Sequence, residues 1–110
     1  DSQLLYKFEI DKILSIISIN FDKRIVKIDD VPINLANMEY RILELLVKRK
    51  GTIVTRDMLL NHLYPSSKDI PEHDGLKVFI CRLREKLAKA SGGINYIENI
   101  RVTGYKLKYC

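Results

Sequence analysis

The sequence predicts an α+β fold in which four short strands precede three helices and a closing β-hairpin. In the first third, short β-branched runs alternate with turn residues. At Ala36 the spacing of apolar residues changes to that of a helix, and near the C-terminus two extended runs flank a turn. With 110 residues, of which 46% are hydrophobic, the chain suits one domain, 1–110, with one modest core.

The N-terminal segment, residues 1–35, is expected to form a four-stranded antiparallel sheet. Its predicted strands are 4–10, 14–20, 24–28 and 31–35. Asp29-Asp30 marks the turn before the last strand. Pro32 lacks a backbone N–H and is tolerated in a strand at the edge of a sheet, so the fourth strand is expected at an edge.

Residues 36–63 are expected to hold two helices. The first has apolar residues at i, i+4, i+7 and i+8, which are Met38, Ile42, Leu45 and Leu46. It ends with the basic run 48–50, which suits the negative end of the helix dipole, followed by Gly51. We interpret this run as a C-terminal cap rather than a ligand site. Thr55 is a suitable N-cap for the second helix, which runs through Leu63.

The last part of the chain is expected to hold a loop, a third helix and a hairpin. Residues 64–74 show no period and form a loop long enough to suggest a function. The third helix is expected over 75–91, with a helix stop at Gly92-Gly93. Residues 94–110 then form the hairpin. Its strands are predicted at 96–100 and 106–109.

Positive charge is concentrated in the last third of the chain. The net charge is −1 over residues 1–35, +1 over 36–73 and +5 over 74–110. Evenly spread basic charge usually serves only solvation, but a localised excess indicates a surface for a polyanion.

Several classes of protein are not supported. No stretch approaches the roughly 18 apolar residues of a membrane span and no signal peptide is evident, so we expect a soluble cytoplasmic protein. Cys81 and Cys110 are interpreted as reduced thiols without a chemical role. His62 and His73 have no catalytic or metal-ligand set around them, so neither an enzyme, a metal site nor a cofactor is expected. His62 is expected to pack or cap in the second helix.

The predicted third helix has two faces of opposite character. On a helical wheel, four apolar residues fall within about 60° of one another: Leu76, Ile80, Leu83 and Leu87. The opposite face carries Val78, Cys81, Arg82, Glu85 and Lys89, with Lys77, Arg84 and Lys86 on its shoulders. Five of the six ionised groups are basic, and small, weakly polar side chains lie among them, which is unusual for a merely solvated face.

Such a face suits the major groove of DNA, which admits an α-helix. Arginine can bond guanine edges in a fork, and a small apolar side chain can contact a thymine methyl group. Glu85 fits least well, because it would repel phosphate unless it pairs with Lys89 or accepts a hydrogen bond from a cytosine amine.

Motifs along nearly the whole chain resemble the C-terminal effector domain of the OmpR/PhoB response regulators. They are the run 78–87, the triplets 96–98 and 103–105, residues 32–35 leading into 39–43, and residues 55–60. The resemblance implies a winged helix-turn-helix whose third helix is the recognition helix and whose hairpin is the wing. It implies sequence-specific binding of double-stranded DNA as part of a two-component transcriptional regulator.

The resemblance also implies individual roles. Arg82 and Arg84 would reach bases or phosphates, and Arg101 would enter the adjacent minor groove. Arg56, Tyr64 and Tyr105 match positions that hold phosphates. The full expected DNA-binding set is Arg56, Tyr64, Lys77, Val78, Cys81, Arg82, Arg84, Lys86, Arg101, Thr103 and Tyr105.

Further partners follow from the same resemblance. The loop 64–74 matches the segment through which family members contact RNA polymerase. Its expected contact residues are Pro65, Ser66, Ser67, Lys68 and Asp69. Two copies would bind A·T-rich direct repeats head to tail. A receiver domain is missing from these residues, so we expect either an excised effector domain or a protein without that switch, and a sensor kinase would act only through such a receiver.

The sequence departs from the family pattern at several positions. Ala36 replaces the hydroxyl residue that usually caps the first helix, with Asn37 as a substitute cap. Asp74-Gly75 is expected to weaken the start of the recognition helix, and Val102 stands in the wing where glycine is common. These departures bear on the preferred DNA sequence more than on the fold.

Two other binding functions remain as alternatives. A winged helix can also serve as a protein-interaction module without nucleic acid. RNA is less favoured, because the deep, narrow A-form groove excludes a helix and no row of stacking aromatic residues is evident. Binding to phosphates should weaken steeply with salt, and binding to a protein groove much less.

Overall fold

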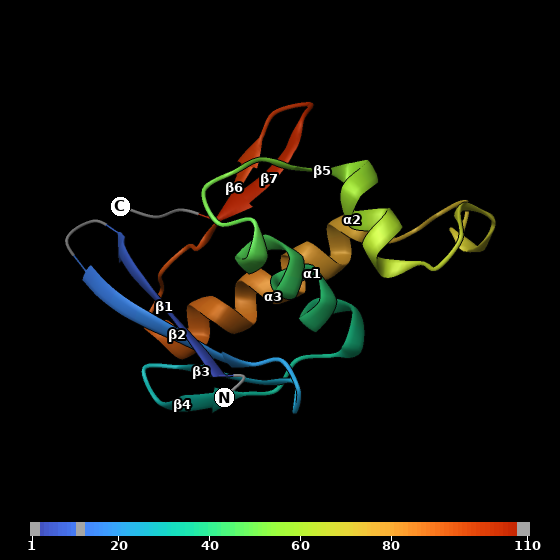
Figure 1. The fold of residues 1–110 in the computed structure, drawn as a ribbon. Helices are drawn as coiled ribbons and strands as arrows, with labels where there is room; N and C mark the ends of the chain where they lie inside the picture. The colour runs from blue at the N-terminus through green and yellow to red at the C-terminus, as the bar shows by residue number, and fades with distance from the viewer. Residues whose placement is uncertain (1–2, 11–12, 108–110) are drawn as a thin grey trace.

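The computed structural model describes residues 3–10 and 13–107, which form an α+β fold with three helices and two sheets (Figure 1). In chain order the elements are β1 (Gln3–Ile10), β2 (Ile13–Asn20), β3 (Ile25–Ile28), β4 (Val31–Ile33), α1 (Asn37–Lys48), β5 (Val54–Thr55), α2 (Arg56–Leu63), the 3₁₀ turn η1 (Ser67–Asp69), α3 (Leu76–Ser91), β6 (Ile97–Ile100) and β7 (Gly104–Leu107). Cys110 and the predicted strand end at 108–109 lie outside the described residues.

The N-terminal sheet is antiparallel with the strand order β1-β2-β3-β4. Asp29 and Asp30 form the two-residue loop between β3 and β4, with φ values of 49° and 69°. Positive φ at both positions is typical of a type I′ hairpin turn. Pro32 lies on β4, at the edge of the sheet, where its missing N–H leaves no central pairing unsatisfied.

The helices begin at residues that satisfy their first N–H groups. The Thr55 side chain accepts a hydrogen bond from the Met58 amide (3.1 Å), as predicted for the start of α2. Before α1, the Glu39 carboxylate accepts from the Ala36 amide (3.2 Å). Asn37 does not replace the missing cap, because its side-chain oxygen accepts from Arg24 (2.8 Å).

The start of α3 differs from the expectation. Gly75 has φ +68°, and the Asp74 carboxylate accepts a hydrogen bond from the Leu76 amide at 2.9 Å. Only a glycine adopts this left-handed conformation without steric cost, and the carboxylate satisfies an otherwise free N–H. Asp74-Gly75 therefore supports the helix start instead of weakening it.

The core is enclosed by the three helices and by one face of each sheet. The predicted apolar stripe of α3 is fully engaged in it: Leu76, Ile80, Leu83 and Leu87 are each at most 2% exposed. The other buried side chains come mainly from β2, β3, α1, α2 and the wing strands. This stripe fixes which side of α3 faces outward.

The C-terminal hairpin is part of a three-stranded sheet with the order β5-β7-β6. The sequence predicted only the hairpin and an extended link at 52–54. A strand of two residues is too short to show the alternation of apolar and polar residues that indicates a strand. β5 pairs with β7 through Val54↔Tyr105 and Thr55↔Gly104. A Cβ atom at Gly104 would lie 2.2 Å from the Val54 carbonyl oxygen, so this close pairing requires glycine. β5 thereby ties the wing to the start of α2.

Candidate nucleic-acid interface

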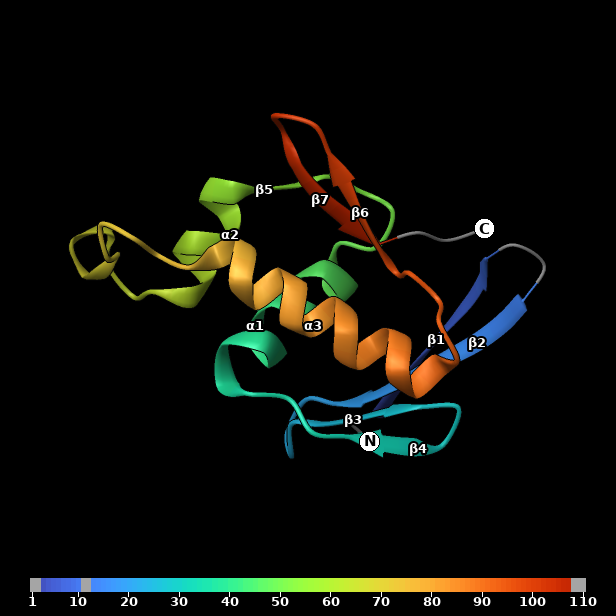
Figure 2. The same ribbon diagram turned by 180° about the vertical axis from the view of Figure 1, so that it is seen from behind.

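One side of α3 is open to solvent along its length. Figure 2 shows α3 in front, with the wing above it and the N-terminal sheet below, and no described helix or strand crosses its outer side. We define the outer face of α3 by its exposed residues Lys77, Val78, Cys81, Arg82, Glu85 and Lys89. Val78 is 51% exposed, so a small apolar side chain lies among the charged residues of this face.

The two arginines of α3 have different surroundings. Arg82 is exposed on the outer face. Arg84 is half-buried, and its guanidinium carbon lies 6.0 Å from the centre of the Tyr105 ring on β7. The Arg84 Nε atom is buried without a hydrogen-bond partner. Within the described part of the chain neither arginine pairs with a carboxylate, so both cations are available to a polyanion.

Lys86 is not on the outer face. Its ammonium lies 2.5 Å from a carboxylate oxygen of Glu39, whose side chain is only 3% exposed. The pair joins α3 to the first turn of α1, where Glu39 also caps the Ala36 amide. The sequence indicated Lys86 as a shoulder residue, but nothing in the local pattern pointed to a partner 47 residues away.

Arg101 lies at the tip of the wing and is exposed to solvent. Residues 101–103 form the turn between β6 and β7, closed by a hydrogen bond from the Thr103 amide to the Ile100 carbonyl (3.1 Å). Val102 has φ +68° and is 99% exposed. A β-branched residue is strained in this conformation, and it has no burial to compensate for the strain. The turn is nevertheless formed with valine at this position.

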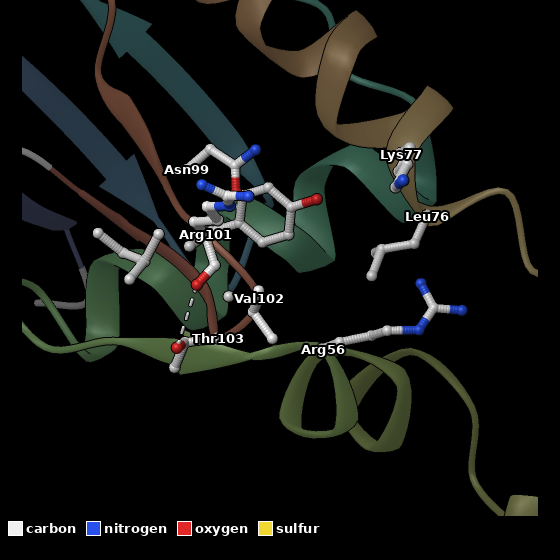
Figure 3. Close-up of a pocket in the computed structure, with 10 residues that line it drawn as sticks. Arg56, Leu76, Lys77, Asn99, Arg101, Val102 and Thr103 are labelled. Atoms are coloured by element: carbon white, nitrogen blue, oxygen red, sulfur yellow. Dashed lines mark hydrogen bonds between the residues drawn. The ribbon is translucent and has the colours of Figure 1, made fainter.

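A groove of about 320 Å³ separates the wing from the start of α3 (Figure 3). Arg56, Leu76 and Lys77 line one side, and wing residues between Asn99 and Tyr105 line the other. Each of its three charged lining residues, Arg56, Lys77 and Arg101, is a cation. Lys77 and Arg101 form no ion pair within the described residues, so they concentrate positive potential between the helix and the wing.

Arg56 is oriented by a contact that the sequence did not indicate. Its guanidinium forms an ion pair with Asp74, the residue that also accepts a hydrogen bond from the Leu76 amide. Asp74 is largely buried and Arg56 is half-exposed. Asp74 therefore links the first residue of α2 to the first turn of α3.

The two tyrosines expected to contact phosphates, Tyr64 and Tyr105, pack against the core and are largely or partly buried. Tyr105 is 9% exposed; its backbone pairs with Val54 of β5, and its ring lies beneath the Arg84 guanidinium. Tyr64 follows the last residue of α2, donates its amide to the Leu60 carbonyl (3.0 Å) and packs against the core.

The loop between α2 and α3 projects from the body of the molecule (Figure 1). The expected polymerase-contacting residues are all exposed: Pro65, Ser66, Ser67, Lys68 and Asp69. The turn η1 orders their centre, and the Ser66 side chain accepts from the Lys68 amide (3.3 Å).

His62 has a structural role in packing α2 against α1. Its Nε2 atom lies 3.0 Å from a carboxylate oxygen of Glu44, in line with the expected packing role. Among the residues that the structure describes, no three His, Cys, Asp or Glu side chains gather as a metal site would require. Over the same residues, no helix has the length and apolarity to cross a membrane.

Comparison with known families identifies the chain. The family described as transcriptional regulatory protein, C terminal, matches residues 30–107. The chain belongs to this family. The match extends from the β3–β4 turn through β7 and so includes both α3 and the wing. This family of transcription regulators is not an enzyme class.

Individual relatives agree with this assignment. The cell cycle response regulator CtrA of Brucella anthropi is 44% identical over 90 residues, which is 82% of this chain and 38% of that protein. The chain therefore spans about two fifths of the length of this relative. The predicted resemblance to OmpR/PhoB effector domains is confirmed, and within that family the chain is similar to CtrA.

Solved structures of the family include two complexes with DNA. The DNA-binding domain of the response regulator AdeR, in complex with an intercistronic region, superposes with a TM-score of 0.73 at 28% identity, over 86% of this chain and 95% of that one. The Klebsiella pneumoniae RstA DNA-binding domain, in complex with the RstA box, has a TM-score of 0.69 at 27% identity, over 84% and 90% of the two chains.

Proposed function

We propose that this chain binds specific sequences of double-stranded DNA as the effector domain of a two-component response regulator. The observation that carries the proposal is the uncovered cationic outer face of α3 beside a wing whose tip presents Arg101. A helix of this kind fits the major groove, and an arginine on a hairpin fits a narrow minor groove. The family membership and the relatives that bind DNA support the same function.

The expected contacts divide into two groups by position. Val78, Cys81 and Arg82 lie where side chains of α3 would meet base edges. The groove residues Arg56, Lys77 and Thr103 lie where the sugar-phosphate backbone would pass between helix and wing. Tyr105 lines this groove, and the Arg84 guanidinium lies 6.0 Å from the centre of its ring. Lys86 is excluded from our set, because its ammonium is held by Glu39.

We also propose the wider partners of a response regulator. The exposed residues 65–69 would contact RNA polymerase, and two copies would bind A·T-rich direct repeats head to tail. Since its relatives are bacterial response regulators, the chain would act in the cytoplasm. Control by a sensor kinase would pass through a receiver domain outside these residues.

The decisive experiment is selection of bound duplexes from a random DNA pool, followed by affinity measurements on the selected site between about 50 and 200 mM salt. We expect a defined consensus and a steep linear fall of log K with log salt. A protein-interaction module would select no consensus and would show little salt dependence. The variant Arg82→Ala, which alters only the outer face, should weaken binding to the selected site while leaving the urea midpoint unchanged.

A further inference from the structure

Glu85 is the one acidic residue among those that define the outer face of α3. It lies seven residues after Val78, so the two side chains share one line of the helix about 10.5 Å apart along its axis. This line is opposite the apolar stripe that faces the core. If α3 enters a major groove, Glu85 points at base edges about three base pairs from those that face Val78.

The charge of Glu85 is not neutralised within the described part of the chain. Lys89 lies one turn later on the same face, but no ion pair joins the two side chains. The contact of Glu85 that we observe is a weak hydrogen bond, in which the Cys81 thiol donates to a carboxylate oxygen over 3.8 Å. An unpaired carboxylate on a surface that approaches phosphates lowers affinity for DNA in general.

A carboxylate at a base edge, however, is selective. An ionised carboxylate only accepts hydrogen bonds. In the major groove the amino groups of cytosine and adenine are the donors, whereas guanine offers two acceptors and repels a carboxylate. Adenine N6 stands beside the acceptor N7, but cytosine N4 has no neighbouring acceptor on its own base. Cytosine is therefore the base that Glu85 fits best.

We propose that Glu85 is a specificity-determining residue that accepts a hydrogen bond from the N4 amino group of a cytosine. Cys81 assists by holding the carboxylate on the outer face. The cations of the outer face then attract the phosphates of any DNA sequence, while Glu85 disfavours guanine at one position. This inference rests on the proposed function, since it needs α3 in the major groove.

The test compares random-pool selections for the unaltered protein, Glu85→Ala and Glu85→Gln. We expect the unaltered protein to require cytosine at one position, and Glu85→Ala to lose that requirement. On duplexes in which only this pair is changed, preference for C·G over G·C should fall roughly tenfold in Glu85→Ala. Affinity for random DNA should rise, because a negative charge is removed. Glu85→Gln, which can donate as well as accept, should tolerate guanine.

Asp30→Asn is the matched control for charge. It removes one carboxylate charge at the β3–β4 turn, where the left-handed backbone suits asparagine. It should leave the base preference unchanged. If Glu85→Ala selects the same base at every position as the unaltered protein, the inference is wrong while the proposed function stands. If the unaltered protein selects no sequence at all, both are wrong.

Discussion

Lys86 and Arg84 lie two positions apart on α3, yet they serve different purposes. The Lys86 ammonium neutralises the buried carboxylate of Glu39, whereas the Arg84 guanidinium lies over the ring of Tyr105 and pairs with no carboxylate within the described residues. A basic residue on the shoulder of a recognition helix is therefore not by itself a DNA contact. What differs is the place of the paired cation: Lys86 is held by a buried carboxylate away from the groove, whereas Arg56, which pairs with Asp74, stays half-exposed and lines the groove.

We expect Lys86→Met to reduce stability without altering how DNA binding depends on salt. Removing the ammonium leaves the buried Glu39 carboxylate without a cation, with only the Ala36 amide as a donor, which costs about 3 kcal/mol. Urea unfolding measures the loss, with Lys89→Met, an exposed position on the same helix, as the control that should change stability by less than about 0.5 kcal/mol. A variant of normal stability whose salt slope falls by about one would place Lys86 at a phosphate instead.

At the scale of elements, α1 and α2 are joined by a cluster of polar side chains around Glu44. One carboxylate oxygen lies 3.0 Å from His62 Nε2, and the other accepts from the Tyr40 hydroxyl (3.3 Å). Lys48 lies 4.0 Å from the same carboxylate. Burial, followed by the charge of Glu44 and its hydrogen bond, raises the pKa of Tyr40 from 10.0 to about 12, against a smaller opposing effect of Arg24.

This shift predicts a loss of stability at high pH that is specific to Tyr40. In the folded state the phenol keeps its proton to higher pH, so its contribution is complete below pH 10 and is lost between pH 10 and 12. The full loss amounts to about 2.7 kcal/mol, of which about 2 kcal/mol is reached at pH 11.5. Urea unfolding at pH 8 and at pH 11.5 would measure it. Tyr40→Phe should be less stable at pH 8 by about 1 kcal/mol, because it loses a hydrogen bond, and should lose less between the two pH values. Equal losses in both proteins would contradict the assignment.

The sequence predicted those elements that carry their own local signals. α2 and α3 were expected from apolar spacing, from Thr55 and from the glycines at 92–93, and the structure ends them within a residue of those positions. β5 was missed, because its two residues are defined by pairing with β7. The contacts of Lys86 with Glu39 and of Arg56 with Asp74 were also missed. They join residues 47 and 18 positions apart, and no local sequence pattern indicates such a contact. The apolar stripe was enough to predict that the outer face of α3 is exposed. It did not show which basic residues form ion pairs with carboxylates elsewhere in the chain.

At the scale of the whole molecule, basic residues lie both on the N-terminal sheet and on the wing, but the proposed function gives only those on the wing a contact with DNA. The N-terminal sheet directs Val26 and Ile28 into the core, so Lys27 between them faces the opposite side, away from α3. Arg101 instead lies at the wing tip and lines the groove beside α3. The domain can then engage two adjacent grooves of DNA at once, with α3 in one and the wing in the other.

Arg101→Ala tests whether the wing takes part in this two-groove arrangement. Because a narrow A·T-rich minor groove attracts arginine, affinity should fall most on sites with A·T-rich flanks, roughly tenfold, and much less on sites with G·C-rich flanks. Lys27→Ala removes the same charge from the sheet and should weaken both kinds of site slightly and equally. Titrations of the two variants on both duplexes, at one fixed salt concentration, provide the comparison. Equal weakening of both sites by Arg101→Ala would make Arg101 a phosphate contact, and no weakening would remove the wing from the interface, leaving α3 to bind alone.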